Sequence, residues 1–165
     1  MTARLRERYP LAGRTLGMSI SDGVIDRIAD APLSAHLATS VDDRPHVAPV
    51  WFVYEGGDAY RAASDDAIED DRLWILTGGK KLENVRRNPR VAVSIEQADE
   101  SGVDWAVQLL GTAREFDDPD RIAAVEAAMD DIYRDETATD GGDAPPGEWA
   151  LLGIRIGSAT VQRYE

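Results

Sequence analysis

Cysteine is absent from the 165-residue chain, which therefore has no disulfide bond, thiolate nucleophile or zinc–thiolate site. Apolar runs all fall well short of the roughly 20 residues that a membrane-spanning helix needs. Residues 1–14 carry arginine and glutamate with no apolar stretch behind them, which does not fit a secretory signal. From these absences we expect a cytoplasmic protein that does not enter membranes.

Lysine is nearly absent as well. Only two of the 18 basic residues are lysines, whereas 20 of the 31 acidic residues are aspartates, and the formal net charge is −13. Molar salt screens repulsion among surface carboxylates, because the Debye length falls to about 3 Å at 1 M. We therefore interpret the composition as adaptation to high salt, with an ordinary acidic protein as the alternative. So acidic a surface also argues against nucleic acid or anionic lipid as a partner.

The length allows one domain with a hydrophobic core and is too short for two. Residues 1–18 include Pro10 and Gly13 and predict a loose arm, followed by a single domain over residues 19–165. Ser21 and Asp22 are good caps for a short helix, which must end before Pro32.

Most of the remaining sequence predicts β-structure. Residues 33–39 and 46–54 read as a hairpin around a turn at 42–45. Residues 55–72 and 135–147 are polar and are expected as loops. Further strands are expected at 73–77, at 91–95, at 103–116 with a bulge near Gly111, at 149–156 and at 160–164.

Two helices should interrupt these strands. One spans 80–88, between Gly78-Gly79 and Pro89, and the other starts at Asp117–Pro119. The second helix carries an apolar stripe, formed by Ile122, Val125, Met129 and Ile132. Because strands and helices do not alternate regularly, we predict no doubly wound sheet. We predict a mainly β (α+β) fold, an antiparallel split β-barrel of six to seven strands with short flanking helices.

The only two lysines, Lys80 and Lys81, stand at the start of the first of these helices. The helix dipole is positive there, so each should cost about 0.3–1 kcal/mol unless an anion offsets it. Free N–H groups at a helix start suit phosphate, Thr77 can add a hydroxyl, and the glycines allow close approach. The segment therefore predicts an anion site, although it is not a P-loop. The alternative is that both lysines pair with surface carboxylates.

Pro49 lies within an apolar strand, where it removes a hydrogen-bond donor from the ladder. That strand should be an edge, or its backbone should face something other than a strand, such as a flat aromatic ligand. Trp51 and Tyr54 could pack on such a ligand or in the core.

His36 and His46 lie on different predicted strands, and two nitrogen ligands make a poor metal site. We expect structural roles for both and no metal centre, although His46 adjoins the Pro49 segment. The sequence offers no catalytic triad and no paired carboxylates, so catalytic residues stay unassigned.

Three stretches, Leu37–Trp51, Leu73–Ile95 and Trp105–Gly111, together resemble one family. The pattern Arg-Pro-His-Val-Ala-Pro-Val-Trp, followed by Lys-x-x-Asn-Val-x-x-Asn-Pro-x-Val, is similar to that of the FMN-binding split-barrel proteins that include pyridoxamine 5′-phosphate oxidase. The resemblance covers most of residues 32–116.

This resemblance implies a homodimer with two FMN sites at the subunit interface. The residues implied beside the isoalloxazine ring are Pro49, Val50 and Trp51. Those implied at the phosphate are Thr77, Lys80 and Lys81, with Lys81 matching the family lysine because Asn84 follows it by three. Further contacts carried over from the family are Asn84 and Gln108. The ending Val-Gln-Arg-Tyr-Glu lacks the family's arginine and histidine signature for pyridoxamine phosphate, so we expect another small-molecule substrate.

Three hypotheses about function follow. The first is an FMN-dependent oxidoreductase, in which the flavin supplies the redox chemistry. The second keeps the fold and replaces FMN with a deazaflavin coenzyme or haem. The third is a non-catalytic protein that stores or senses flavin, or is associated with stress.

Overall fold

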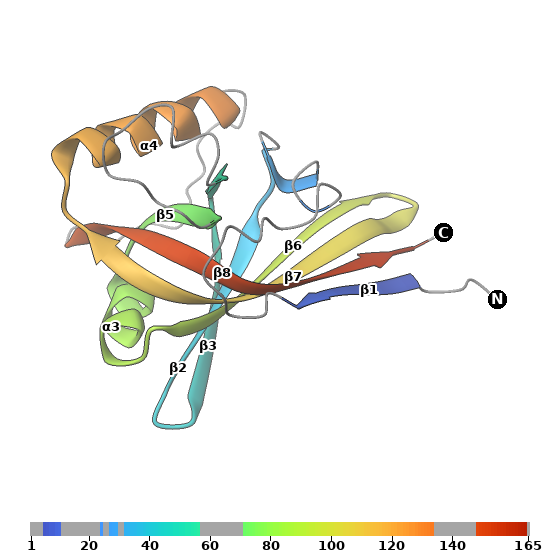
Figure 1. Cartoon of the computed structure of the whole chain (residues 1–165), viewed down its shortest axis with the longest axis horizontal. Coiled ribbons are helices and arrows are strands. Elements are labelled where there is room, and N and C mark those ends of the chain that lie inside the picture. Colours follow the sequence, from blue (N-terminus) through green and yellow to red (C-terminus); the bar gives the residue numbers. More distant parts are fainter. Residues whose placement is uncertain are drawn as a thin grey trace.

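The structure, a computed structural model, describes residues 5–10, 24, 27–29, 32–56, 71–133 and 148–164, and of residues 5–10 it describes the backbone alone. Two helices and eight strands lie in these ranges (Figure 1). The helices are α3 (Gly79–Arg87) and α4 (Pro119–Ile132). The strands are β1 (Leu5–Pro10), β2 (Ala35–Val41), β3 (Arg44–Val50), β4 (Val53–Glu55), β5 (Arg72–Gly78), β6 (Arg90–Asp99), β7 (Gly102–Phe116) and β8 (Trp149–Arg163).

All the strands belong to one antiparallel sheet in the order β3-β2-β6-β7-β8-β5-β4, with β1 paired to β8. The two ends of this path, β3 and β4, are consecutive in the chain, and only Trp51 and Phe52 separate them. A sheet whose end strands are joined by two residues must curl back on itself. This curling confirms the predicted mainly β split barrel.

The barrel interior holds the main core. Phe52, at the junction of the two end strands, is buried in it. Short apolar segments outside the sheet also contribute, among them Val24 and Ile28 from the predicted first helix and Leu82 and Val85 from α3. The largest fully buried strand residues in this core are Leu37, Leu73, Ile75, Ile95, Leu109, Leu152 and Ile154.

A second core lies between α4 and the outer face of the sheet (Figure 1). Asp118 caps α4 by accepting a hydrogen bond from the Asp120 N–H at 3.0 Å, and Pro119 occupies the first turn. The predicted apolar stripe of this helix is confirmed, since Val125 and Met129 are buried and their neighbours on the stripe pack beside them. Strand β5 is therefore covered on both faces, which explains its uninterrupted apolar sequence.

The structure has eight strands where six to seven were predicted, because β1 is additional and two further differences cancel. The strand expected over 46–54 is broken into β3 and β4, because the Tyr133 hydroxyl occupies the backbone N–H and C=O of Phe52. Conversely, the strands expected at 149–156 and 160–164 are one strand, β8. The turn expected at 42–45 is confined to Asp42 and Asp43, both with positive φ, as a two-residue hairpin turn requires.

The bulge expected near Gly111 is confirmed, because the β7–β8 register shifts between Leu110 and Gly111. The residue left without a partner there is Gly157 of β8. A side chain at Gly111 would run into the carbonyl oxygen of Arg155, so the close approach of the two strands requires glycine at that position.

The segment expected as an irregular arm contains β1, which pairs with residues 158–163 of β8. Strand β5 pairs only with residues 149–155 of β8, so the same edge stays open beyond that point and β1 covers it. Ser21, Asp22 and most of the two predicted loops lie outside the described residues. In the ranges that the structure describes, neither helix has the length and apolarity to cross a bilayer.

Candidate functional site

The junction of β5 and α3 presents an uncapped helix start. Gly78 occupies the cap position without a side-chain hydrogen bond, and the first turn of α3 contains no acidic residue. Gly79 has φ +63°, and a side chain placed there would meet nothing within 4 Å. The helix start therefore has room beside Gly79, although the Glu148 backbone lies close to Gly78, and the N–H groups of an uncapped helix start are the kind that bind anions.

Lys80 is exposed and Lys81 half-buried in this first turn. Neither forms an ion pair with any carboxylate in the described part of the chain, whereas both arginines at the other end of α3 do. Arg86 contacts Glu115 and Glu148, and the hydrogen bonds that it donates to these carboxylates, to Glu148 above all, raise its pKa. Surface pairing, the alternative that we considered for the lysines, is thus not what the structure shows.

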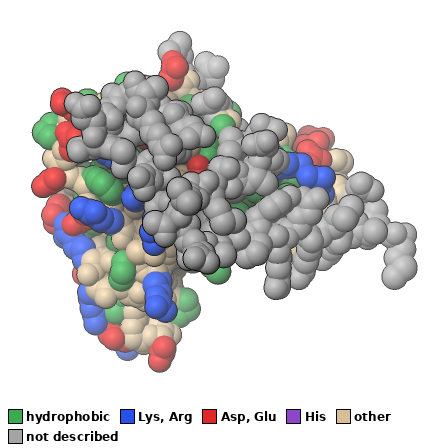
Figure 2. Space-filling model, viewed as in Figure 1, with side chains coloured by type: hydrophobic (Ala, Val, Ile, Leu, Met, Phe, Trp, Pro, Cys, Tyr) green, Lys and Arg blue, Asp and Glu red, His purple; other side chains and the backbone are tan. Residues whose placement is uncertain are grey.

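Basic residues are concentrated on this helix and at the start of the strand that follows it. Residues 80–90 hold five of the 18 basic side chains of an otherwise acidic protein. Figure 2 shows basic side chains, interspersed with acidic ones, over the part of the molecule that contains α3 and the β2–β3 hairpin. The two lysines therefore place positive charge at the start of α3, where an anion would need it.

Two asparagines fix the direction of α3. Asn84 donates to the Thr39 hydroxyl at 2.9 Å, and Asn88 donates to the Ser40 carbonyl at 2.8 Å. The residue numbers of α3 and of β2 rise in the same direction between these two contacts. The first turn of α3, which holds Lys80 and Lys81, therefore lies toward the Ala35 end of β2. Ala35 pairs with Val50 of β3. The start of α3 and Val50 thus lie toward the same end of β2. Asn84 itself is 3% exposed and holds the helix, so a contact with the cofactor stays a prediction.

Thr77 is only 2% exposed and shares the barrel-facing side of β5 with Leu73 and Ile75. Its side chain is therefore buried on the inner face of β5, just before the Gly78-Gly79 turn. Its role toward an anion also stays a prediction.

The Pro49 segment behaves as expected of an edge. Strand β3 ends the sheet path and pairs with β2 alone among the described strands. Pro49 is exposed, Val50 is buried in the barrel core, and the Trp51 ring stacks on Tyr133 with centroids 4.5 Å apart and planes 5° from parallel. Tyr54 is a core residue rather than a free aromatic surface, since its hydroxyl donates to Asp71 at 2.7 Å.

Tyr133, at the end of α4, holds this segment in place. Its hydroxyl accepts from the Phe52 N–H at 3.1 Å and donates toward the carbonyls of Leu33 at 2.8 Å and Phe52 at 3.1 Å. Sequence reasoning missed this residue, because it lies 81 positions from Phe52 and 100 from Leu33, and only its place after the apolar stripe of α4 distinguishes it.

We expect Tyr133→Phe to lower the free energy of unfolding by about 1–3 kcal/mol, since it leaves the buried Phe52 N–H without an acceptor. Urea titration followed by Trp fluorescence measures the change. An unaltered midpoint and slope would show that the hydroxyl does not hold the β3–β4 junction.

Gln108 lies elsewhere in the fold. The register places it in one row across the sheet with Pro49, and His36 and Ser94 stand between them. Three strand spacings separate Pro49 from Gln108 by about 14 Å, so one chain does not bring these two predicted residues together.

From β3 to β8, the outer face of the sheet around Gln108 carries no aspartate, glutamate, lysine or arginine over two adjacent rows, and the first charged residue in these rows is Arg8, where the first row continues into β1. Val47 and Leu110 are 63% and 60% exposed on it, although both are large apolar side chains. The first row is Pro49, His36, Ser94, Gln108 and Thr160, and the second is Val47, Ala38, Ala92, Leu110 and Ser158. We call these ten residues the uncharged face.

The two histidines point to opposite sides of the sheet. His36 belongs to the uncharged face, while His46 pairs with the buried Thr39 and lies on the inner side, where its Nδ1 has no hydrogen-bond partner. They therefore cannot share a ligand.

The fold is shared with several solved structures of low sequence identity. A FAD-binding protein from Mesorhizobium loti matches with 18% identity and a TM-score of 0.62, over 98% of this chain and 99% of that chain. A structure described as an F420 reductase matches with 23% identity and a TM-score of 0.56, over 85% of this chain and 98% of that chain. The FAD-binding protein of Mycobacterium smegmatis matches with 18% identity and a TM-score of 0.53, over 88% and 95%.

A search of curated protein sequences finds no match. The family model described as pyridoxamine 5′-phosphate oxidase, by contrast, matches residues 21–163, nearly the whole chain. The chain therefore belongs to the pyridoxamine 5′-phosphate oxidase family.

Proposed function

We propose that this protein binds FMN and acts as a flavin-dependent oxidoreductase on a small molecule. The observation that carries the proposal is the pair of lysines at an uncapped helix start, without ion pairs in the described structure, in a chain that has no other lysine. A phosphate there would offset both cations and accept from the free N–H groups.

FMN, when bound, would supply hydride and electron transfer, and the protein would supply binding and orientation. Lys80 and Lys81 would hold the phosphate. The edge segment at Pro49, Val50 and Trp51 would lie along the ring, with Trp51 kept in place by Tyr133.

Several related cofactors carry a phosphate that the same lysines could hold. A deazaflavin coenzyme is the main alternative, and one structure of this fold is described as an F420 reductase. FAD is a further possibility, because two others are described as FAD-binding proteins.

The decisive test is the visible absorbance spectrum of the native protein together with the mass of whatever it releases. We expect a yellow protein that releases FMN. Colourless protein that takes up no added flavin in either low or high salt would overturn the proposal. A bound flavin that neither NADH, NADPH nor reduced deazaflavin can reduce would instead favour a storage or sensing role.

We also propose a homodimer built on the uncharged face. A ten-residue surface without Asp, Glu, Lys or Arg is costly to leave in water on a protein of net charge −13, and a second copy presents the same neutral surface without repulsion. Two-fold pairing would also bring Gln108 of the partner subunit toward the Pro49 segment, from which Gln108 of the same chain is separated by about 14 Å.

Leu110→Asp should convert the dimer to monomer, because it places two carboxylates in the centre of the contact. Analytical ultracentrifugation measures the change. Ala127→Asp, on the exposed side of α4, adds the same charge away from this face and should leave the mass unchanged. If the two variants have the same mass in solution, the interface does not lie on the uncharged face.

Finally, we propose that the acidic surface is an adaptation to molar salt in the cytoplasm. The free energy of unfolding should then rise steadily between about 0.1 and 2 M KCl, as self-repulsion is screened. A stability that is flat or falling over this range, measured by thermal unfolding, would make the composition that of an ordinary acidic protein.

A further inference from the structure

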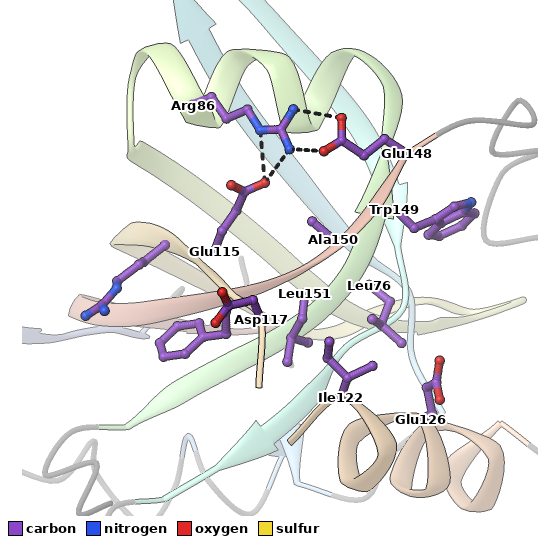
Figure 3. Close-up of a pocket in the computed structure, with 12 residues that line it drawn as sticks. Leu76, Arg86, Glu115, Asp117, Ile122, Glu126, Glu148, Trp149, Ala150 and Leu151 are labelled. Carbon is purple, nitrogen blue, oxygen red and sulfur yellow. Dashed lines mark hydrogen bonds and ion pairs between the residues drawn. The ribbon is translucent and has the colours of Figure 1, made fainter. Parts of the chain in front are cut away.

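A cavity of about 650 Å³ opens where the start of α4 meets the ends of β5, β7 and β8 (Figure 3). None of its lining residues belongs to the predicted cofactor site. Its floor is apolar and is formed by Leu76, Phe116, Ile122, Ala150 and Leu151. The volume is in the range of small-molecule sites, which also combine an apolar floor with a few polar groups.

Trp149 stands at the edge of this cavity (Figure 3) and is 50% exposed. The other two large apolar side chains that are exposed in the described residues, Val47 and Leu110, both lie on the uncharged face. Trp149 is therefore the one whose exposure the proposed dimer does not explain. An indole at the mouth of a cavity with an apolar floor offers a surface for a flat apolar group and, through its ring face, for a cation.

The charges around the cavity favour a positive ligand. Four carboxylates and two guanidinium groups line it, a local excess of two negative charges. Arg86 is shared between Glu115 at 2.8 Å and Glu148 at 2.6 Å, which lowers the pKa of Glu148. Figure 3 shows this network along one side of the cavity and Glu126 on the opposite side.

The other charged groups that line the cavity are Arg114, Asp117 and Glu126. The Arg114 guanidinium lies over the Phe116 ring, 5.2 Å from its centre. Asp117 and Glu126 form no ion pair within the described ranges. Asp117 and Glu126 can therefore interact with a ligand, whereas Arg86 and Arg114 already contact other side chains.

We propose that this cavity binds a small amphipathic organic cation, with an apolar or aromatic body on Trp149 and Leu76 and an ammonium group attracted by the two separate carboxylates of Glu126, on α4, and Asp117, before its start. The proposal is independent of flavin binding, because it uses none of the lysine, Pro49 or Gln108 residues. It predicts a ligand class of amines rather than of phosphates.

The test uses the full-length protein and three probes of similar shape: 2-phenylethylammonium, the neutral 2-phenylethanol and the anion 3-phenylpropionate. Each is titrated while the indole N–H signals are followed by NMR, and Trp149→Phe identifies the Trp149 signal. The Trp105 indole, which is bonded to Gln97 on another part of the sheet, serves as the internal reference. We expect the cation to shift the Trp149 signal with at least about a fivefold lower Kd than the neutral probe, with the anion weakest.

Charge variants then locate the ammonium group. Glu126→Gln combined with Asp117→Asn should remove most of the preference for the cation over the neutral probe. Asp130→Asn, one turn further along α4 and outside the cavity, should retain it. The proposal is overturned if no probe moves the Trp149 signal at about 10 mM, if all three bind equally, or if Asp130→Asn has the same effect as the double variant.

Discussion

Lys81→Ala should weaken FMN binding by about 1.5–3 kcal/mol, the range for a charge-assisted hydrogen bond, which corresponds to a roughly 10- to 150-fold higher Kd. Riboflavin, which lacks the phosphate, should bind with nearly unchanged affinity. Fluorescence titration of the apoprotein with both ligands gives the two constants. The contrast between the ligands, rather than the loss alone, identifies the lysine with the phosphate.

Arg87→Ala is the matched control for this variant. It removes the same charge from the same helix, but at the end where Arg87 pairs with Asp42. We expect less than about a threefold change in FMN affinity, because this exposed charge lies six residues, or about 9 Å, further along the helix and is already paired with Asp42. If Lys81→Ala and Arg87→Ala weaken FMN equally, or if riboflavin is lost together with FMN, the lysine does not contact the phosphate.

Trp74→Ala should produce the largest loss of stability, about 3–5 kcal/mol. The ring is fully buried under α4, and Arg121 lies over it with 5.0 Å between guanidinium carbon and ring centre. The Trp74 ring has room because its partner residue on β8 is Gly153. A side chain at position 153 would come within 2.7 Å of Trp74 and Phe116. Urea unfolding measures the loss, and Trp105→Ala, which truncates a partly exposed ring, should cost clearly less.

Trp74→Phe keeps an aromatic ring in the core but removes the indole N–H, and so isolates the contribution of its hydrogen bond to stability. The indole N–H donates to Glu55 at 2.5 Å, and burial raises the pKa of Glu55 above 4.5 despite this bond and the nearby arginines. Without the donor this pKa rises further, so the ionised carboxylate costs more stability at neutral pH. Because the cost applies only to the charged form, the gap between wild type and Trp74→Phe should narrow as the pH falls through the pKa of Glu55. A gap that is constant with pH would mean that the hydrogen bond contributes nothing.

Features that depend on nearby residues were predictable from the sequence. The helix start at Lys80, the cap and apolar stripe of α4 and the edge character of the Pro49 strand all follow from patterns a few residues long. The uninterrupted apolar run of β5 was predictable as a strand, but not its two covered faces, which depend on α4 packing outside the barrel.

What the sequence did not predict depends on distant partners. The break at Phe52 is imposed by Tyr133, and β1 forms because β8 has an edge that β5 leaves open. Asn84 was carried over as a cofactor contact, whereas the structure uses its amide to attach α3 to Thr39. No short pattern distinguishes an asparagine that binds a ligand from one that holds a helix.

Strand β8 is hydrogen-bonded to β7, β5 and β1, so among the described strands it carries the ladder that links β5 and β1 to the rest of the sheet. The β2–β3 and β6–β7 pairs are local hairpins that can form early, whereas the β5–β8 pairs close loops of more than 70 residues. Such long-range closure is slow, and the barrel should therefore fold with β8 docking in the rate-limiting step. In hydrogen exchange, the amides of β8 should open only with global unfolding, while those of the two hairpins exchange through smaller local openings.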